Sequence, residues 1–440
     1  MEFMQVQVKK MHNMTTEKLF SFIENSPTAF HAIEAMRCRL KAEGYQPLLE
    51  GSDWNLQAGG KYYVIRNGSS IIAFRIPAKE WKGFQIMASH SDSPTYRIKE
   101  QPEMSVEKHY TKLNIERYGG MIPETWFDRP LSVAGRIIIE ENGQIKDQLV
   151  NIDRDLMIIP NLAIHMSRSS NESKQLNPQK DLLPLCGGNL TKDGFEEMIA
   201  KELGVEKEDI LSYDLFLYNR MRGTTLGINE EFVAAPKLDD LECAYSSIEG
   251  MLNAKLSKDY VTVCAVFDNE EVGSGTKQGA GSTFFPEVLK RISYLCGKNE
   301  EEYYMAVADS FMLSADNAHA VHPNYQDKTD PTNRPYINEG IVLKYNASQK
   351  YTTDANSAAL VKYLCKKEKI KCQVFFNRSD MLGGSTLGNI LTGQVSIKAA
   401  DIGLPQLSMH STYETAGCKD LGDMITLMES FYELGKEVRI

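Results

Sequence analysis

The chain has 440 residues, of which 42% are hydrophobic and 25% are charged, and this length predicts two domains or one large domain with an insertion. A formal net charge of −10 argues against binding to nucleic acid or to an anionic membrane surface. No apolar run approaches the ~20 residues that span a bilayer. The cysteines form no Cys-x-x-Cys pair, and the N-terminal residues lack the apolar core of a secretory signal, so we expect free thiols and a cytoplasmic protein.

Helix and strand signals alternate from the N-terminus to about residue 90. A capping serine before a proline predicts a helix that begins near residue 28. Strands are expected at 62–65 and 70–76, joined by the strong hairpin signal Asn67-Gly68, and again at 83–88. This alternation is typical of an α/β domain.

The composition changes over residues 101–235. Strands are expected at 131–139 and 148–152, and the polar stretch 168–180 indicates an exposed loop. We therefore predict a β-rich inserted domain here, and an α/β domain formed by residues 1–100 and 236–440.

The α/β pattern resumes after this insertion, with a helix expected to begin at Leu238. Residues 260–267 are apolar almost throughout and rich in β-branched side chains, as in a strand buried on both faces of a parallel sheet. That strand runs into a glycine-rich turn that carries Glu270 and Glu271. On a turn both glutamates can face one site, which the alternation of side chains along a strand would prevent. Open α/β sheets bind their ligands at the edge formed by the carboxyl ends of the strands, where this turn lies.

Six polar residues stand at comparable strand ends and helix starts: His90, Asp239, Glu270, Glu271, Asp316 and His410. Imidazole and carboxylate donors without a thiolate suit zinc, manganese or cobalt, and a bridging carboxylate can hold two ions ~3.5–4 Å apart. Asp92, two residues after His90, is placed to accept a hydrogen bond from the other imidazole nitrogen. One carboxylate would stay off the ions and deprotonate a water molecule.

Each of these residues also fits a structural role on its own. A pair of adjacent glutamates is usually solvated surface, a strand-end histidine is often structural, and Asp239 can be a helix N-cap. The pattern alone therefore supports a di-metal hydrolase without deciding for it.

A series of segments along almost the whole chain resembles the aspartyl aminopeptidase and vacuolar aminopeptidase family of di-zinc metallopeptidases. The matching segments, in chain order, are 26–32 (SPTAFHA), 88–94 (ASHSDSP), 126–129 (WFDR), 161–165 (NLAIH), 236–240 (PKLDD), 268–274 (DNEEVGS), 314–323 (SADNAHAVHP) and 405–411 (PQLSMHS). So many ordered matches are highly specific.

The resemblance implies a metalloaminopeptidase that removes single residues from peptides with a free N-terminus. It implies a phosphorylase/hydrolase-like α/β core, with helices on both faces of its sheet, interrupted by a β-rich dimerisation domain. It also implies two divalent ions per subunit, zinc in the family with manganese or cobalt open, and a homo-oligomer, the tetrahedral dodecamer. Glu270 would be the general base, Asp239 would bridge the ions, and the implied ligands are His90, Asp239, Glu271, Asp316 and His410.

Two further positions are implied by the resemblance alone. His165 would reach the active site of a neighbouring subunit and stabilise the developing oxyanion, and Lys344 would recognise an acidic first side chain. Tyr413 stands where many members of this family carry an arginine, and residues 377–388 differ from the sequence that is usual in the family. The preference for Asp or Glu is therefore open. A di-zinc deacylase or carboxypeptidase on the same core, and a non-catalytic oligomeric scaffold, are the alternatives.

Overall fold

The computed structural model describes residues 14–167, 175–189 and 193–435, which form two compact units. The first unit contains Met1–Asp92, Gly223–Met409 and Glu414–Ile440, and the second contains Ser93–Arg222 and His410–Tyr413. The sequence prediction places the insertion at 101–235 and does not include the segment 410–413. The role of the insertion in dimerisation stays a prediction.

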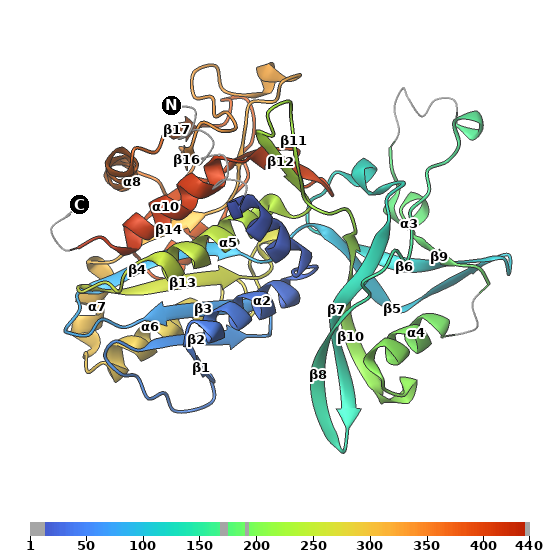
Figure 1. The fold of residues 1–440 in the computed structure, drawn as a ribbon, viewed down its shortest axis with the longest axis horizontal. Helices are drawn as coiled ribbons and strands as arrows, with labels where there is room; N and C mark the ends of the chain where they lie inside the picture. Colours follow the sequence, from blue (N-terminus) through green and yellow to red (C-terminus); the bar gives the residue numbers. More distant parts are fainter. Residues whose placement is uncertain (1–13, 168–174, 190–192, 436–440) are drawn as a thin grey trace. The chain divides into compact units, whose positions relative to one another are not determined.

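The first unit is built on a mixed nine-stranded sheet in the order β1-β2-β3-β13-β4-β14-β18-β16-β17 (Figure 1). Its strands are β1 (Gln46–Leu48), β2 (Lys61–Arg66), β3 (Ser70–Arg75), β4 (Gly83–His90), β13 (Tyr260–Phe267), β14 (Phe311–Ala315), β16 (Ile341–Lys344), β17 (Cys372–Phe375) and β18 (Lys398–Gly403). The hairpin predicted around Asn67-Gly68 joins β2 to β3, and the strand predicted at 260–267 is β13.

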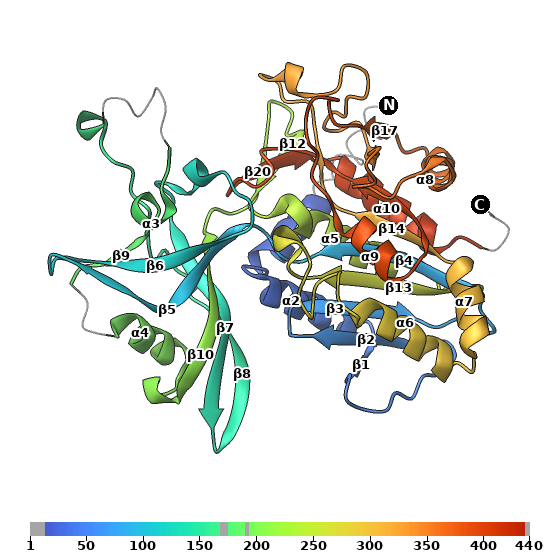
Figure 2. The ribbon, with the colours of Figure 1, turned by 180° about the vertical axis from the view of Figure 1, so that it is seen from behind.

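Helices cover both faces of this sheet, which confirms the predicted α/β class. One face packs against α2 (Ala29–Ala42), α5 (Leu238–Asn253), α8 (Ala355–Glu368) and α10 (Asp420–Tyr432). The other face, turned toward the viewer in Figure 2, packs against α6 (Phe284–Leu295), α7 (Glu300–Ala308) and α9 (Leu387–Gln394). The central strands are therefore buried on both sides, and this explains why β13 consists almost entirely of apolar residues.

The pairing of the central strands decides where the polar residues after them lie. β13 pairs with β4 in parallel, with Phe267 opposite His90, and β14 pairs with β4 in parallel on its other side. The carboxyl ends of β4, β13 and β14 therefore meet at one edge of the sheet.

A five-stranded sheet in the first unit has the order β11-β12-β20-β19-β15. It consists of β11 (Thr224–Leu226), β12 (Phe232–Ala235), β20 (Glu414–Gly417), β19 (Pro405–Leu407) and β15 (Ala318–His319). β12 leads directly into α5 and β15 follows β14, so this small sheet is connected to two of the segments that carry predicted site residues.

The second unit contains a six-stranded antiparallel sheet in the order β8-β7-β10-β5-β6-β9. Its elements are β5 (Thr95–Val106), β6 (Tyr110–Tyr118), β7 (Leu131–Glu141), β8 (Gln144–Asn151), β9 (Leu185–Gly187), β10 (Ile210–Asn219), α3 (Pro178–Asp181) and α4 (Gly194–Leu203).

The prediction of a loop over 168–180 is wrong for its last three residues, 178–180, which are helical. Residues 168–174 lie outside the described residues, but Pro178 begins the short helix α3, and the Asn177 side chain caps it by accepting from the Gln179 N–H. An asparagine followed by proline is itself a helix-start signal, which the polar composition of the stretch concealed.

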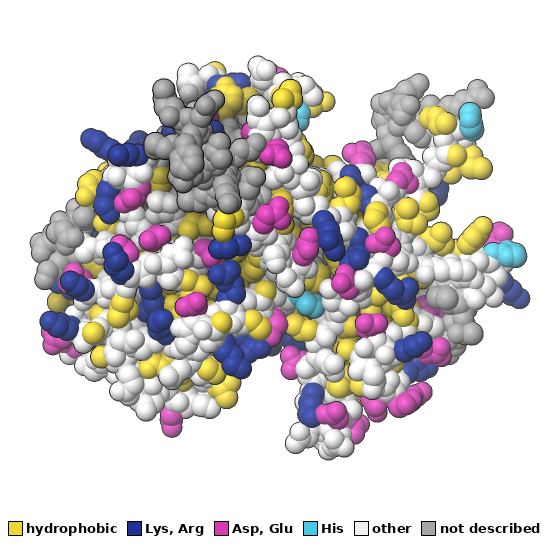
Figure 3. Space-filling model, in the orientation of Figure 1, with side chains coloured by type: hydrophobic (Ala, Val, Ile, Leu, Met, Phe, Trp, Pro, Cys, Tyr) yellow, Lys and Arg dark blue, Asp and Glu magenta, His cyan; other side chains and the backbone are white. Residues whose placement is uncertain are grey.

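The described surface mixes charges of both signs. On the face drawn in Figure 3, Lys and Arg side chains lie among Asp and Glu, without a large area of one sign. Within the described part of the chain, no helix combines the length and apolar composition that crossing a membrane requires.

Gly250 lies where α5 packs closely against α10, and we expect a larger side chain there to lower stability. A Cβ at this position would lie 2.6 Å from Met428 Cβ, so Gly250→Ala should push the two helices apart. We expect a loss of about 1–3 kcal/mol in the free energy of unfolding, measured by urea or thermal denaturation.

The matched control is Gly393→Ala in α9, where an added Cβ has open space. There the gain in helix propensity should leave stability unchanged or raise it by up to about 1 kcal/mol. Equal effects of the two substitutions would contradict the close approach at Gly250.

Candidate metal centre

His90 is the last residue of β4, and its buried imidazole faces two different environments. Nδ1 lies 3.1 Å from the backbone oxygen of Asp92 and 3.4 Å from Asp92 Oδ1. Nε2 lies 3.6 Å from Asp239 Oδ1 and 3.9 Å from Asp316 Oδ1. When the ring is neutral with its hydrogen on Nδ1, facing residue 92, the Nε2 lone pair would be available to a cation bound among the carboxylates.

Asp239 and Asp240 stand where β12 passes into α5, in backbone that is not yet helical. The Asp239 N–H donates to Glu414 Oε2 at 3.0 Å, and Asp240 Oδ2 accepts from the His90 N–H at 3.0 Å. The peptide bond between the two aspartates is cis. Asp240 therefore connects the start of α5 to the end of β4.

Glu270 and Glu271 lie in a single 3-10 turn, Glu270–Val272, that follows β13. The Asp92 carboxylate accepts from both backbone amides, Oδ1 from Glu270 and Oδ2 from Glu271, each at 3.1 Å. The Asp92 side chain therefore has two partners, the His90 imidazole and the backbone of the glutamate turn. The sequence predicted only the first of them.

Asp316 follows β14 and is paired with Lys344, the last residue of β16. The buried Lys344 ammonium donates to Asp316 O at 2.8 Å, to Asp316 Oδ2 at 3.1 Å and to Asn317 O at 3.2 Å. An ammonium has three N–H donors, and each of them has an acceptor here. Nothing in the sequence joins these residues, since β18 lies between β14 and β16 in the sheet.

The side chains from these segments form overlapping groups in which one ligand atom of each residue lies within 4.8 Å of the others. The groups in the first unit are His90 with Asp239, Asp240 and Asp316, and His90 with Glu270 and Glu271. Asp240 was not predicted, because its sequence signal is only its position beside Asp239. Its Oδ1 is buried and has no hydrogen-bond partner among the described residues.

Burial and crowding shift the protonation of this cluster. Burial raises the pKa of Glu270 to about 7; the His90 charge opposes that rise, and Asp316 and Asp92 add to it. Burial, with Asp239 next in size, raises the pKa of Glu271 well above its usual value. Burial likewise holds the pKa of Asp240 high, whereas Lys344 and His90 overcome burial and lower the pKa of Asp316.

The donors fit a divalent cation. The groups offer one imidazole nitrogen and several carboxylate oxygens at a buried edge of the sheet, which is a donor set that zinc accepts. Burial raises the pKa values of Glu271 and Asp240, that is, it disfavours their charged forms. A bound cation would act in the opposite direction, because metal binding favours the deprotonated form of its ligands.

Two predicted site residues belong to the second unit. His410 has a backbone φ of +67°, and its carbonyl oxygen accepts from the Ile122 N–H at 3.1 Å. His165 is exposed in the short 3-10 helix Ile164–Met166. Their participation in the site stays a prediction.

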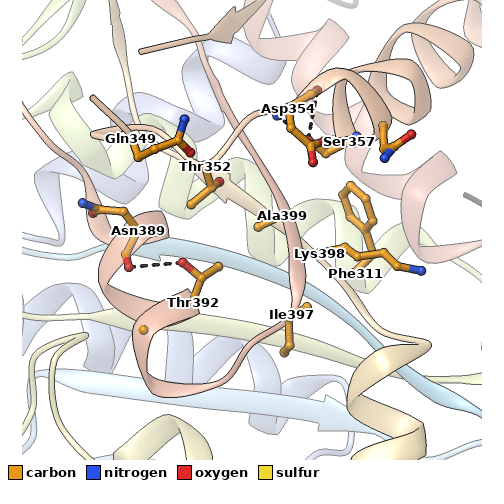
Figure 4. Close-up of a pocket in the computed structure, with 12 residues that line it drawn as sticks. Phe311, Gln349, Thr352, Asp354, Ser357, Asn389, Thr392, Ile397, Lys398 and Ala399 are labelled. Atoms are coloured by element: carbon orange, nitrogen blue, oxygen red, sulfur yellow. Dashed lines mark hydrogen bonds between the residues drawn. The ribbon is translucent and has the colours of Figure 1, made fainter. Parts of the chain in front are cut away.

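A separate cavity of about 590 Å³ opens in the first unit between α8, α9 and β18 (Figure 4). Polar side chains such as Gln349, Thr352 and Asn389 line it, with Phe311 and Ile397 as apolar parts of the wall. No predicted site residue lines this cavity, so it is distinct from the metal centre.

Comparison with known proteins identifies the class. The sequence profile described as "Aminopeptidase I zinc metalloprotease (M18)" matches residues 22–432. A Clostridium novyi protein named "Probable M18 family aminopeptidase 2" is 46% identical over 428 residues, which cover 95% of this chain and 98% of that protein. The class that these matches define is that of the zinc metallopeptidases.

Solved structures give the same result. The structure titled "Cryo-EM structure of the Ape4 and Nbr1 complex" superposes with a TM-score of 0.93 at 36% identity, covering 96% of this chain and 86% of that chain. The mApe1 dodecamer of S. cerevisiae superposes with a TM-score of 0.84 at 27% identity, covering 96% of this chain and 97% of that chain. This chain belongs to the aminopeptidase I zinc metalloprotease (M18) family, and the resemblance stated from its sequence motifs is confirmed.

Proposed function

We propose that this chain hydrolyses the first peptide bond of peptides with a free N-terminus at a centre of two divalent ions, zinc being the first candidate. Family membership supports the aminopeptidase reaction over the deacylase, carboxypeptidase and scaffold alternatives. The single observation that carries the site is the convergence of His90, Asp239, Asp316 and Glu271 at one buried sheet edge. When bound, the ions polarise the scissile carbonyl and lower the pKa of a bound water.

The proposed ligands are His90, Asp239, Glu271, Asp316 and His410, with Asp239 bridging the two ions. His90 ends β4, and Asp239, Glu271 and Asp316 come from the segments after β12, β13 and β14. Their geometry in the first unit supports them. His410 is included on the resemblance of its motif. Asp92 would hold the His90 ring through Nδ1 and keep Nε2 available to the cation.

Glu270 is the proposed general base. Its backbone is fixed beside Glu271, but its carboxylate makes no hydrogen bond to another described residue, so it is available to take a proton from water and pass it to the leaving amine. Glu271, its neighbour, is proposed to bind the metal directly.

Glu270→Gln should lower kcat about 10²–10⁴-fold, because an amide cannot accept the proton. Metal content should stay near that of the wild type, since the substitution leaves every proposed ligand in place. Turnover of an aminoacyl substrate and metal analysis on the same preparation measure both effects.

Glu271→Gln is the matched control, one residue away on the same turn. It should lose metal as well as activity, because it removes a proposed ligand. Equal metal loss in the two variants would contradict the separate roles of Glu270 and Glu271.

A preference for Asp or Glu at the first position, read by Lys344, is proposed from the resemblance. In the structure all three Lys344 donors face acceptors on residues 316 and 317, so reading a substrate carboxylate requires one of these bonds to be released. The ammonium also lies 5.1 Å from the centre of the Tyr351 ring, within cation–π range.

Lys344→Met separates recognition from the support of Asp316. If Lys344 reads an acidic side chain, kcat/KM should fall at least ~10-fold more for Asp and Glu substrates than for Leu and Ala substrates, the loss of one charge-assisted contact. A panel of these four aminoacyl substrates measures the ratio. A uniform loss across the panel would assign Lys344 to Asp316 alone.

We also propose a homo-oligomer, the tetrahedral dodecamer, in which His165 completes the active site of a neighbouring subunit. The mApe1 neighbour is described as a dodecamer. The side chains around His165 are apolar and exposed, with Met166 76% and Leu162 53% accessible, as at a surface that a second copy covers.

Mixed assembly tests whether His165 acts in trans. Coexpressed Glu270→Gln and His165→Ala subunits should recover activity that neither variant shows alone, because some sites then combine an intact Glu270 with a neighbour's intact His165. Light scattering confirms assembly, and assembled mixtures without recovery would contradict a role in trans.

A further inference from the structure

The position of Glu270 depends on its backbone. Its carboxylate has no hydrogen-bond partner among the described residues, whereas its N–H and that of Glu271 are held by the Asp92 carboxylate at 3.1 Å each. Asp92 fixes the turn from the side of β4. A carboxylate held only through its main chain moves whenever the turn moves, so whatever fixes the other side of the turn also fixes Glu270.

Asn269 holds that other side. It precedes Glu270 in a left-handed conformation with φ of +61°. Its side-chain Oδ1 accepts from Thr276 Oγ1 at 2.8 Å and from Gln278 Nε2 at 2.7 Å, and its backbone oxygen accepts from the Ser274 N–H at 2.7 Å. One side-chain oxygen therefore joins the glutamate turn to the glycine-rich loop 273–281.

This loop is firmly attached to the sheet. Ser70 Oγ on β3 accepts from the Asp268 N–H at 2.9 Å and donates to Gln278 O at 2.7 Å. The loop also folds closely on itself, since a Cβ at Gly279 would lie 2.4 Å from Ser274 O. Asn269 is thus bonded to a loop that is itself held to the sheet. Through these bonds the loop can limit the movement of the glutamate turn.

We propose that Asn269 is a positioning residue for Glu270, acting through the bonds from Thr276 and Gln278 to its side-chain oxygen. The inference rests on the proposed role of Glu270 as general base. The backbone conformation next to Glu270 does not by itself require an asparagine, because a glycine would adopt the left-handed conformation equally well. What glycine lacks is the oxygen that binds the loop.

Asn269→Gly is the central variant, since it keeps the backbone conformation and removes only the side-chain bonds. With zinc-saturated enzyme, kcat should fall about 10–100-fold, as displacements of about 1 Å from productive geometry can do. KM and metal content should stay within about twofold of the wild type. Thr276→Val should cause a smaller loss, and Thr276→Ser, which keeps the hydroxyl donor, should restore it. Lys277→Ala, on an exposed side chain between the two donors, serves as the control.

Two comparisons separate positioning from a general structural role. The double variant Asn269→Gly/Glu270→Gln should be no slower than Glu270→Gln alone, because a residue that acts only through Glu270 has nothing left to position. Normal kcat in Asn269→Gly, an additive loss in the double variant, or full recovery on adding zinc would each overturn the inference. Normal turnover in Glu270→Gln would instead overturn the proposed function. If the Asn269 variants do not fold, the Thr276→Val and Thr276→Ser pair decides by the same criteria.

Discussion

The parallel pairing of β4 with β13 and β14 is the constraint on which the site depends. It brings the carboxyl ends of three strands to one edge, so residues that are more than 200 positions apart in the chain, such as His90 and Asp316, become neighbours. Helices cover both faces of these strands, so the edge is also buried. A buried edge with several strand ends is where an α/β sheet can concentrate polar groups without disturbing its core.

Concentrating carboxylates in a buried place creates an electrostatic problem, which the structure meets in two ways. Lys344 neutralises Asp316 by a direct ion pair at 3.1 Å, and this lowers the pKa of that aspartate. Burial raises the pKa values of Glu271 and Asp240, and the His90 charge opposes that rise without cancelling it. Burying an isolated charge is strongly unfavourable, so a divalent cation would stabilise these carboxylates. The crowding that is unfavourable for the carboxylates alone would therefore favour binding of the proposed ions.

The sequence predicts local structure and strand ends well, because both depend on neighbouring residues. The Asn67-Gly68 hairpin, the apolar strand 260–267 and the turn at Glu270 follow from short patterns, and the structure contains each of them. The bond from Lys344 to Asp316 depends on the order β14-β18-β16, which no local pattern encodes. The hydrogen bonds from two backbone amides to the Asp92 carboxylate could not be predicted either, because they join the segment after β4 to the turn after β13.

Adjacent glutamates can have different functions because of the shape of the turn that carries them. In a strand, neighbouring side chains point to opposite faces, and one of the two would leave the site. In a 3-10 turn with about three residues per turn, successive side chains diverge by roughly 120°, so both can remain near the site and still face different partners. Here the largest neighbouring charge acting on Glu271 is Asp239, whereas for Glu270 it is His90, followed by Asp316. The proposed division between a metal ligand and a free carboxylate would therefore follow from the conformation of the turn, to which Asp92 and Asn269 are bonded.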